Sequence, residues 1–250
     1  MSSMQQNYAE QFPAIKNKPG REKKAQKILQ ALRWFLDIPD LAGARLLDVG
    51  CSSGAMSEVF AHAGARVVAI DIDRAAVHDA KRSQSTQAQY LITDAGSSPF
   101  PDESFDIIIC SQVYEHYPEL NRLVDEIYRL LSPEGKCYFS GPNKLAVIEE
   151  HYFLPFLSWL PKSLADRYLR IFRSANEYYE KPKTFWQLRK ALSCFHIHDI
   201  SKSMLQNPQD YSIDDRVRPI YASFFKVIPD FLWPIIECLT PNFNWILSKN

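Results

Sequence analysis

Short apolar runs alternate with helical patterns through the first 142 residues, and this alternation most constrains the fold. The runs are ARLLDVG, ARVVAIDID, QAQYLITD, SFDIIIC and GKCYFSGPN, with helical periodicity at 21–36, 54–63, 74–83 and 119–132. Each run has the length of a buried strand rather than of a helix. Strands that alternate with helices predict an α/β fold with a doubly wound parallel sheet and right-handed crossovers.

The composition changes after residue 142. All eight glycines lie between Gly20 and Gly141, whereas 19 of the 32 aromatic residues follow residue 142. A helix at 184–193 and strands at 194–201 and 242–249 are still recognisable there. We therefore expect the chain to return and complete the sheet.

The predicted organisation is a single domain over residues 1–250. Its core comprises 20–143, 184–203 and 241–250. Two aromatic, proline-broken segments interrupt the core, and they are called the first insert (144–183) and the second insert (204–240). We expect the inserts to form an aromatic-rich helical cap.

Charge and cysteine pattern exclude several classes of protein. The 29 basic and 29 acidic residues balance, which argues against nucleic acid as a partner. The five cysteines are scattered, odd in number and without CxxC spacing, so we expect buried thiols rather than disulfides or a metal site. The N-terminus lacks the apolar stretch of a signal peptide, and no run approaches the ~18–20 apolar residues of a membrane span. We therefore expect a cytoplasmic protein without a transmembrane segment.

Acids and glycines stand where the first three predicted strands end. LLDVGCSSG is a strand, a turn with Gly50 and Gly54, and then a helix, while Asp71 and Asp94 follow the next two strands. Glycine permits a positive φ or close approach of backbone to ligand, and a helix N-terminus offers free amide donors. An acid after the second strand can accept both ribose hydroxyls of an adenosine. These residues predict a pocket for an adenosine-bearing ligand.

Taken in order, these motifs resemble the class I S-adenosylmethionine-dependent methyltransferases, especially the small-molecule group that includes ubiquinone and menaquinone biosynthesis methylases. LLDVGCSSG, AIDID, TDAGSSPFPDESFDIIICSQVYEHYPEL and LLSPEGKCYFSGPN each resemble a motif of that family. The resemblance covers residues 20–142 well. It implies a Rossmann-like sheet of seven mostly parallel strands, S-adenosyl-L-methionine as cofactor, and methyl transfer as activity.

The resemblance also implies a set of cofactor-binding residues. The loop after the first strand would surround the methionine portion, the next two strand ends would hold ribose and adenine, and the fourth would border the methyl group. The set is Asp48, Gly50, Cys51, Ser52, Gly54, Asp71, Ile72, Asp94, Ala95, Ser111 and Gln112. Ser52 departs from the family, which often has glycine there, and a serine restricts φ.

Two other functions stay open on the sequence. A nicotinamide-dependent oxidoreductase would carry GxGxxG, whereas this chain has GxxxG after the first strand. A catalytically inactive, methyltransferase-like binding or scaffold subunit would keep the same cofactor motifs.

The loop QVYEHYP after the fourth strand marks the acceptor side. His116 is the best candidate for a general base, because histidine titrates near neutrality and this one lies on the ligand face. A structural histidine in the loop is the alternative. Glu115 in the same loop, His151 in the first insert and Asn143 after the fifth strand are expected on the substrate side.

The inserts decide which acceptor is used. Their aromatic side chains either pack among themselves, line an apolar acceptor pocket or touch a membrane surface. The basic stretch from Lys16 to Arg33 is either a solvated helix face or a contact for an anionic surface. Tyr8 and Phe12 lie in a segment that folds over the cofactor in related enzymes. We expect a small, hydrophobic or lipid-linked acceptor, methylated at oxygen, and peripheral contact with a membrane.

Overall fold

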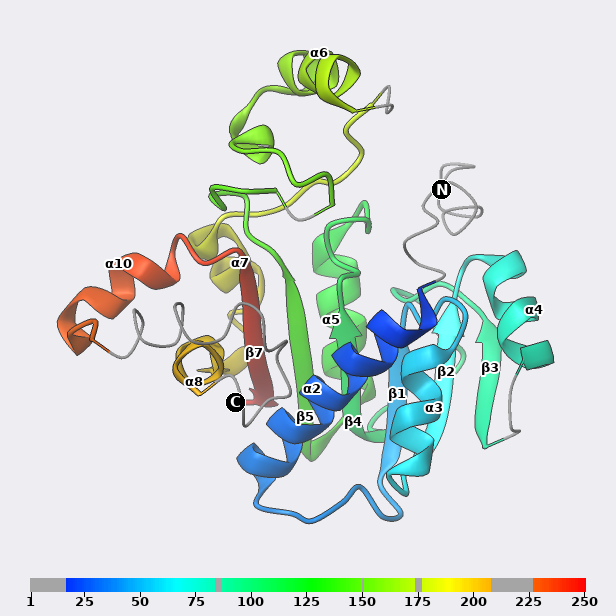
Figure 1. Ribbon diagram of the computed structural model, residues 1–250. Coiled ribbons are helices and arrows are strands. Elements are labelled where there is room, and N and C mark those ends of the chain that lie inside the picture. The colour runs from blue at the N-terminus through cyan, green and yellow to red at the C-terminus, as the bar shows by residue number, and fades with distance from the viewer. Residues whose placement is uncertain (1–16, 84–86, 150, 174–176, 208–226) are drawn as a thin grey trace.

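Seven strands form one sheet in the computed structural model, which describes residues 17–83, 87–149, 151–173, 177–207 and 227–250. The strand order is β3-β2-β1-β4-β5-β7-β6 (Figure 1). Strands β1 to β5 are parallel, and β7 runs antiparallel to both of its neighbours. The predicted doubly wound, mostly parallel sheet is therefore confirmed. Tyr8 and Phe12 lie outside the described residues.

The elements follow the predicted order along the chain. The strands are β1 (Arg45–Val49), β2 (Arg66–Asp71), β3 (Ala88–Ile92), β4 (Phe105–Ser111), β5 (Leu131–Pro142), β6 (Phe195–Asp199) and β7 (Asn242–Lys249). The helices are α2 (Lys18–Leu36), α3 (Ala55–His62), α4 (Arg74–Ser83), α5 (Leu120–Leu130), η3 (Leu157–Trp159), α6 (Lys162–Phe172), α7 (Phe185–Ala191), α8 (Ser201–Gln206), η5 (Asp230–Leu232) and α10 (Trp233–Glu237).

Two element boundaries differ from the expectation. Helix α2 begins at Lys18, because the side chain of Asn17 accepts a hydrogen bond from the Gly20 N–H and a proline occupies the first turn. Strand β5 begins at Leu131, directly after α5, and its register with β4 shifts between Phe105 and Ile107. A helical periodicity alone does not reveal either feature.

Helices cover both faces of the sheet. Leu46 of β1 packs in one buried cluster with residues of α2 and α3, whereas Leu47 packs in a second cluster with residues of α5 and α7. This alternation follows from the two-residue period of a strand. Because both faces are covered, ligand access is left to the ends of the strands, and the parallel strands direct their carboxyl ends to one edge.

The first insert follows β5 at that edge and rises away from the sheet with α6 at its far end (Figure 1). It has a small apolar cluster of its own, made of Tyr152, Leu154, Leu157, Ala165, Leu169 and Tyr178. By contrast, α8 spans the predicted start of the second insert, and Met204 packs within the main cluster on the α2 side of the sheet. The division into core and inserts stays a prediction.

No helix among the described residues combines the length and apolar character that crossing a membrane requires.

Candidate functional site

The loop after β1 is a tight turn held in left-handed backbone conformations. Gly50, Ser52 and Gly54 have φ values of 72°, 50° and 77°. A Cβ at Gly50 would lie 2.7 Å from a methyl carbon of Val113, so glycine is required there by both φ and space. Ser52 adopts the positive φ despite its Cβ, which is the strain that its departure from the family pattern predicts.

Asp71 at the end of β2 holds this loop in place. Its carboxylate accepts hydrogen bonds from the N–H groups of Ser52, at 2.7 Å, and Asp73, at 2.9 Å. Burial raises the pKa of Asp71, and the two backbone hydrogen bonds oppose that rise. A carboxylate has about four acceptor positions, so Asp71 can hold the loop and still accept ligand hydroxyls. Ile72 beside it is partly exposed.

Asp48 and Arg21 form the floor of the same region. Asp48 is buried and accepts a 2.6 Å hydrogen bond from the Ser57 hydroxyl. Burial raises its pKa to about 6, against the hydrogen bond from Ser57 and the charge of Arg21. Arg21 of α2 donates to the carbonyl of Cys51, at 3.4 Å, while its buried Nε has no hydrogen-bond partner among the described residues.

Arg21 reaches this loop although the sequence reasoning left it out of the cofactor set. It precedes the first motif by almost 30 positions, and only the packing of α2 against α3 brings it to the loop. The sequence reasoning singled out Arg21 only as a weak candidate for the acceptor side, because it lies near the start of the first predicted helix.

Asp94 after β3 is tied to the loop after β4. It accepts hydrogen bonds from the Tyr117 hydroxyl at 2.7 Å and the Gly96 N–H at 3.0 Å, and it pairs with Arg122 at 3.2 Å. Ala95 is partly exposed next to it. The predicted adenine contact would therefore use an acid that already joins two strand ends.

The end of β4 places Ser111 and Gln112 beside β5 and β7. The Ser111 hydroxyl lies 2.8 Å from that of Ser140, and the Gln112 amide nitrogen donates to Asn242 at 3.1 Å. Gln112 has a φ of 58°. This bend turns the chain out of the sheet into the loop that carries Glu115 and His116.

Glu115, His116 and His151 are brought together, although His151 belongs to the first insert. Their side-chain donor and acceptor atoms lie within 4.8 Å of one another. Glu115 is fully buried, whereas about a fifth of each histidine side chain is exposed, 22% for His116 and 20% for His151. Both rings are thus reachable from solvent at the edge of the cluster.

The prediction of His116 as a base assumed that it titrates near neutrality, and the structure differs on this point. Burial and, to a smaller extent, the charge of His151 together lower its pKa to about 3, so it does not titrate near neutrality. The imidazole is therefore neutral at physiological pH, and a role as base stays a prediction.

Asn143 is buried, and its side chain is used in hydrogen bonds to the backbone. Its amide nitrogen donates to the carbonyls of Cys238 and Thr240, and its oxygen accepts from the Leu145 N–H. These bonds join the end of β5 to the chain before β7. A contact with the acceptor stays a prediction.

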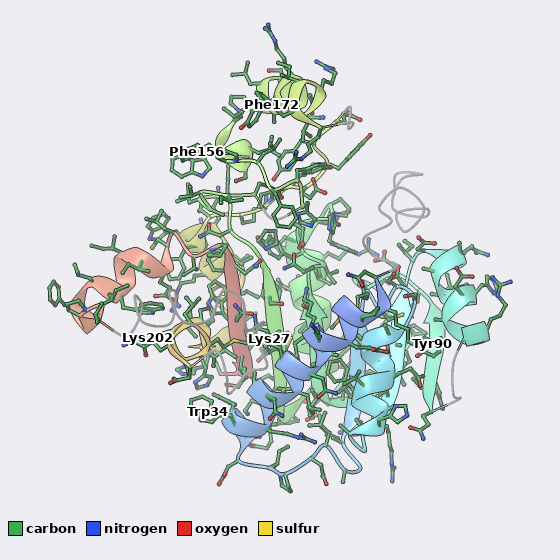
Figure 2. The ribbon with its side chains drawn as sticks, in the orientation of Figure 1. Lys27, Trp34, Tyr90, Phe156, Phe172 and Lys202 are labelled. Carbon is green, nitrogen blue, oxygen red and sulfur yellow. The ribbon has the colours of Figure 1, made fainter. Side chains whose placement is uncertain are left out.

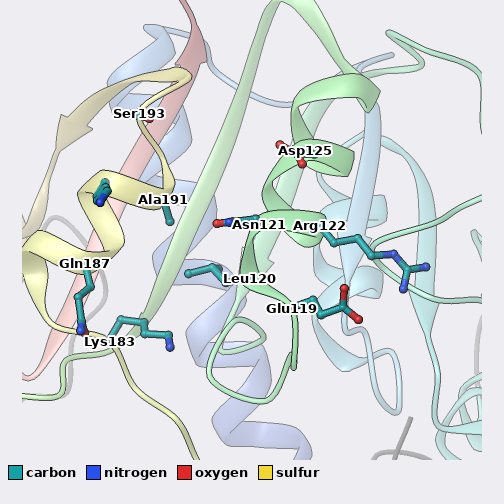
Figure 3. A pocket seen from close by; sticks show the side chains of 10 residues that line it. Glu119, Leu120, Asn121, Arg122, Asp125, Lys183, Gln187, Ala191 and Ser193 are labelled. Carbon is teal, nitrogen blue, oxygen red and sulfur yellow. The ribbon is translucent and has the colours of Figure 1, made fainter.

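The groove between α5 and α7 is a separate feature (Figure 3). It has a volume of about 750 Å³ and is lined by charged and polar residues, among them Glu119, Asp125 and Lys190. None of the predicted site residues lines it.

The loop after β1 fits a ligand with an adenosine and an amino-acid portion. Gly54 begins α3 without a side-chain cap, so amides of the first helical turn are available to a carboxylate. The hydroxyl of Ser52 is buried without a hydrogen-bond partner among the described residues. Together with the Nε of Arg21, these donors suit an anionic group beside Asp71 and Asp94, the two acids that the resemblance assigns to the adenosine.

Known proteins resemble the chain in the same region. Residues 47–139 match a family model described as a methyltransferase domain. Ubiquinone biosynthesis O-methyltransferases of Pseudomonas entomophila and Pseudomonas putida GB-1 are 31% and 32% identical over 137 residues, which are 50% of this chain. The chain spans 59% of the length of each of these relatives.

Solved structures extend the likeness of the fold. An S-adenosylmethionine-dependent methyltransferase from Mesorhizobium loti is 16% identical with a TM-score of 0.56, over 88% of this chain and 96% of that one. The plantazolicin methyltransferase BpumL, solved with SAH, is 17% identical with a TM-score of 0.59, over 98% of this chain and 88% of that one.

The topology and these matches define the class of fold. The chain carries the class I S-adenosylmethionine-dependent methyltransferase fold, and residues 47–139 match the methyltransferase-domain model. Within that class, its central segment is similar to ubiquinone biosynthesis O-methyltransferases.

Proposed function

We propose that the protein transfers a methyl group from S-adenosylmethionine to an oxygen of a small, hydrophobic or lipid-linked acceptor. The observation that carries the proposal is the loop after β1, where Asp71 accepts the Ser52 N–H at the carboxyl edge of the sheet. That loop lies between an uncapped helix N-terminus and the acids Asp48 and Asp71 on adjacent strands, and Asp94 follows the next strand of the sheet. The matches to O-methyltransferases support oxygen as the acceptor atom.

Each part of the cofactor has a matching group in the loop. Arg21 and the first turn of α3 would hold the methionine carboxylate, because a guanidinium pairs with a carboxylate in a planar, bidentate geometry. Asp71 and Ile72 would hold the ribose and one adenine face, and Asp94 and Ala95 the adenine edge. Gly50 and Gly54 would let the backbone approach closely, with Cys51, Ser52 and Asp48 beneath.

The cofactor supplies a methyl group on a positively charged sulfur, and its transfer is an in-line displacement. The protein's main task is to position and desolvate the partners, because the charge is dispersed as the acceptor attacks. Ser111 and Gln112 would border the methyl group at the end of β4. His116 and Glu115 follow them directly, and the exposed part of His116 would face the acceptor hydroxyl.

The first insert supports a hydrophobic acceptor and contact with a membrane surface. Phe153, Ile171 and Phe172 are 70%, 63% and 57% exposed. Figure 2 shows Phe156 and Phe172 on this insert, far from the sheet. Arg167 and Arg170, on the same helix α6 as Ile171 and Phe172, are also exposed. Exposed apolar side chains on a helix that also carries exposed arginines suit the interface of an anionic bilayer.

Methyl transfer from labelled cofactor tests this function. The protein is incubated with S-adenosylmethionine carrying a deuterated methyl group and with prenylated phenols, prenylated catechols and alkyl amines of matched length. We expect label on an oxygen of a prenylated acceptor, detected by mass spectrometry, and far less label with Asp71→Asn at the same low cofactor concentration. Exposed Asp79→Asn on α4 is the matched control and should retain activity. Cofactor binding without transfer to any acceptor would favour the scaffold function, and absence of binding would overturn the proposal.

A further inference from the structure

Two histidines from different parts of the chain meet beside the loop after β4. The ring of His116 from the loop lies against that of His151 from the first insert, edge to face, with centroids 5.6 Å apart. The backbone joins the same two segments, because the Lys181 N–H donates to the carbonyl of Glu115 at 3.0 Å. The contact between the rings is therefore part of how the insert seats on the core.

Besides the His116 ring, three carboxylates surround His151 among the described residues. Its Nδ1 lies 2.8 Å from a carboxylate oxygen of Glu149, which is 2% exposed. Glu180 of the insert and Glu115 of the core are also buried and act on it by charge. Burial lowers the pKa of His151, but Glu149 and the other two acids outweigh it and raise the pKa to about 9.

His116 has the opposite protonation state. Its burial and the positive charge of His151 both disfavour a second proton in the pair, and they outweigh the Glu115 carboxylate, whose Oε1 lies 3.7 Å from the His116 Nε2. In many active sites, two similar titratable side chains lie side by side and their surroundings push their pKa values apart. One side chain is then charged and the other neutral, and they carry out different tasks. Here the charged partner comes from the insert and the neutral one from the core.

We propose that the Glu149–His151 pair of the first insert is a positioning pair that fixes the His116 ring at the methyl-transfer site and adds to the effect of burial in disfavouring its protonation. This inference rests on the proposed function, because it assigns the pair to that site. A neutral imidazole accepts a hydrogen bond from an acceptor hydroxyl, whereas an imidazolium would only donate one. Docking of the insert thus prepares the core histidine for the acceptor.

Histidine titration followed by NMR tests the pair without an acceptor. Protein labelled with ¹⁵N in its six histidines is titrated in EDTA, and His116→Gln and His151→Gln assign the signals. We expect His116 to stay neutral at pH 5 and His151 to stay charged at pH 8. In His151→Gln the His116 titration should move upward by about one pH unit or more, because a neighbouring like charge is gone.

The Glu149→Gln variant tests whether the charge of Glu149, rather than the size of its side chain, sets the titration of His151. It keeps an oxygen for His151 but removes the negative charge, so His151 should lose its proton at lower pH than in the wild type. His198→Gln, at the far edge of the sheet, is the matched control and should leave both signals in place. Where an acceptor is methylated, the acid limb of its pH–rate profile should move upward in His151→Gln by the same amount as the NMR titration.

Three results would overturn the inference. They are a His116 titration that ignores His151→Gln, a His151 that is neutral at pH 7, and pair signals that depend on a divalent metal removed by EDTA. Calorimetry with S-adenosylhomocysteine tests the proposed function independently of the histidine titration. If the wild type does not bind this ligand, the proposed function fails, but the titration result for His116 and His151 is unaffected.

Discussion

The loop after β1 and the first insert both bury carboxylates, but they stabilise them differently. Asp71 is held by backbone amides within a short loop, at positions that glycine and a strained Ser52 make available. Glu149 is held by the His151 side chain and the backbone of Tyr152, inside a segment with its own small apolar cluster. Local backbone geometry builds the first site, and contacts between distant segments complete the second.

This difference has a functional consequence. A site made from backbone amides suits a ligand that is the same throughout a protein class, because side-chain changes elsewhere leave the amides in place. A site completed by insert side chains varies with the insert. Variants in the two regions should therefore separate cofactor binding from acceptor and membrane contacts.

The largest expected effect is on cofactor affinity at Asp71. Asp71→Asn removes the charge that accepts two backbone N–H groups and would accept the ribose hydroxyls. Hydrogen bonds to a charged group contribute about 1.5–3 kcal/mol each, so the Kd for S-adenosylhomocysteine should rise about 100-fold. Calorimetry measures the change, and Asp79→Asn should bind as the wild type does. An unchanged Kd in Asp71→Asn would place the ribose elsewhere.

Asp48 should show a stability gain that depends on pH. Its folded pKa of about 6 lies above the ordinary value of 3.8, so the ionised group opposes folding fully above pH 6; this cost shrinks as the pH falls from 6 to 4 and is absent below about 4. Asp48→Asn keeps an acceptor for Ser57 and should raise the free energy of unfolding by about 2 kcal/mol at pH 7. Denaturant unfolding at pH 7 and pH 4 checks this. A gain equal at both pH values would show that the charge is not its source.

The Arg21→Gln variant should bind S-adenosylhomocysteine with a Kd about tenfold higher than that of the wild type. Arg21→Gln keeps much of the length of the side chain but loses the charge near Asp48, Asp71 and the proposed carboxylate position. Loss of one partly solvated charge-assisted contact corresponds to about 1.4 kcal/mol. The decisive comparison uses a cofactor analogue without the methionine carboxylate. Its Kd should be the same in both proteins, and a loss equal for both ligands would argue for a role in holding the loop instead.

The smallest effect is expected for membrane contact. Replacing Phe153 and Phe172 by serine removes two exposed aromatic side chains from the insert surface and should lower the partition onto anionic vesicles about fivefold. Co-sedimentation at low salt measures the bound fraction. Trp34→Ser on α2, where the side chain is 62% exposed, is the control and should change it little. Equal losses in both proteins would place the contact outside the insert.

The sequence was sufficient for the core because the core depends on local patterns. The strands that carry Asp48, Asp71 and Asp94 are short apolar runs with a polar end, and their parallel pairing brings those ends to one edge of the sheet. The turn at Gly50 was predictable for the same reason, because a glycine directly follows an apolar strand. The structure adds two reasons for that glycine, its positive φ and the nearby Val113 side chain.

The other features of the candidate site could not be predicted from the sequence, because they depend on contacts between residues that are distant in the chain. Arg21 reaches Cys51 only through helix packing. His151 was recognised as a residue that could reach the site, but neither its pairing with Glu149 nor its effect on His116 follows from spacing. Burial then reversed the expectation that His116 titrates near neutrality.

The most direct test of the account is calorimetric titration of S-adenosylhomocysteine into three proteins: the wild type, Asp71→Asn, and the variant with Phe153 and Phe172 replaced by serine. The account predicts one site per chain in the wild type, the same Kd in the insert variant, and a Kd about 100-fold higher in Asp71→Asn. Absence of binding in the wild type, or an equal loss in the insert variant, would contradict it.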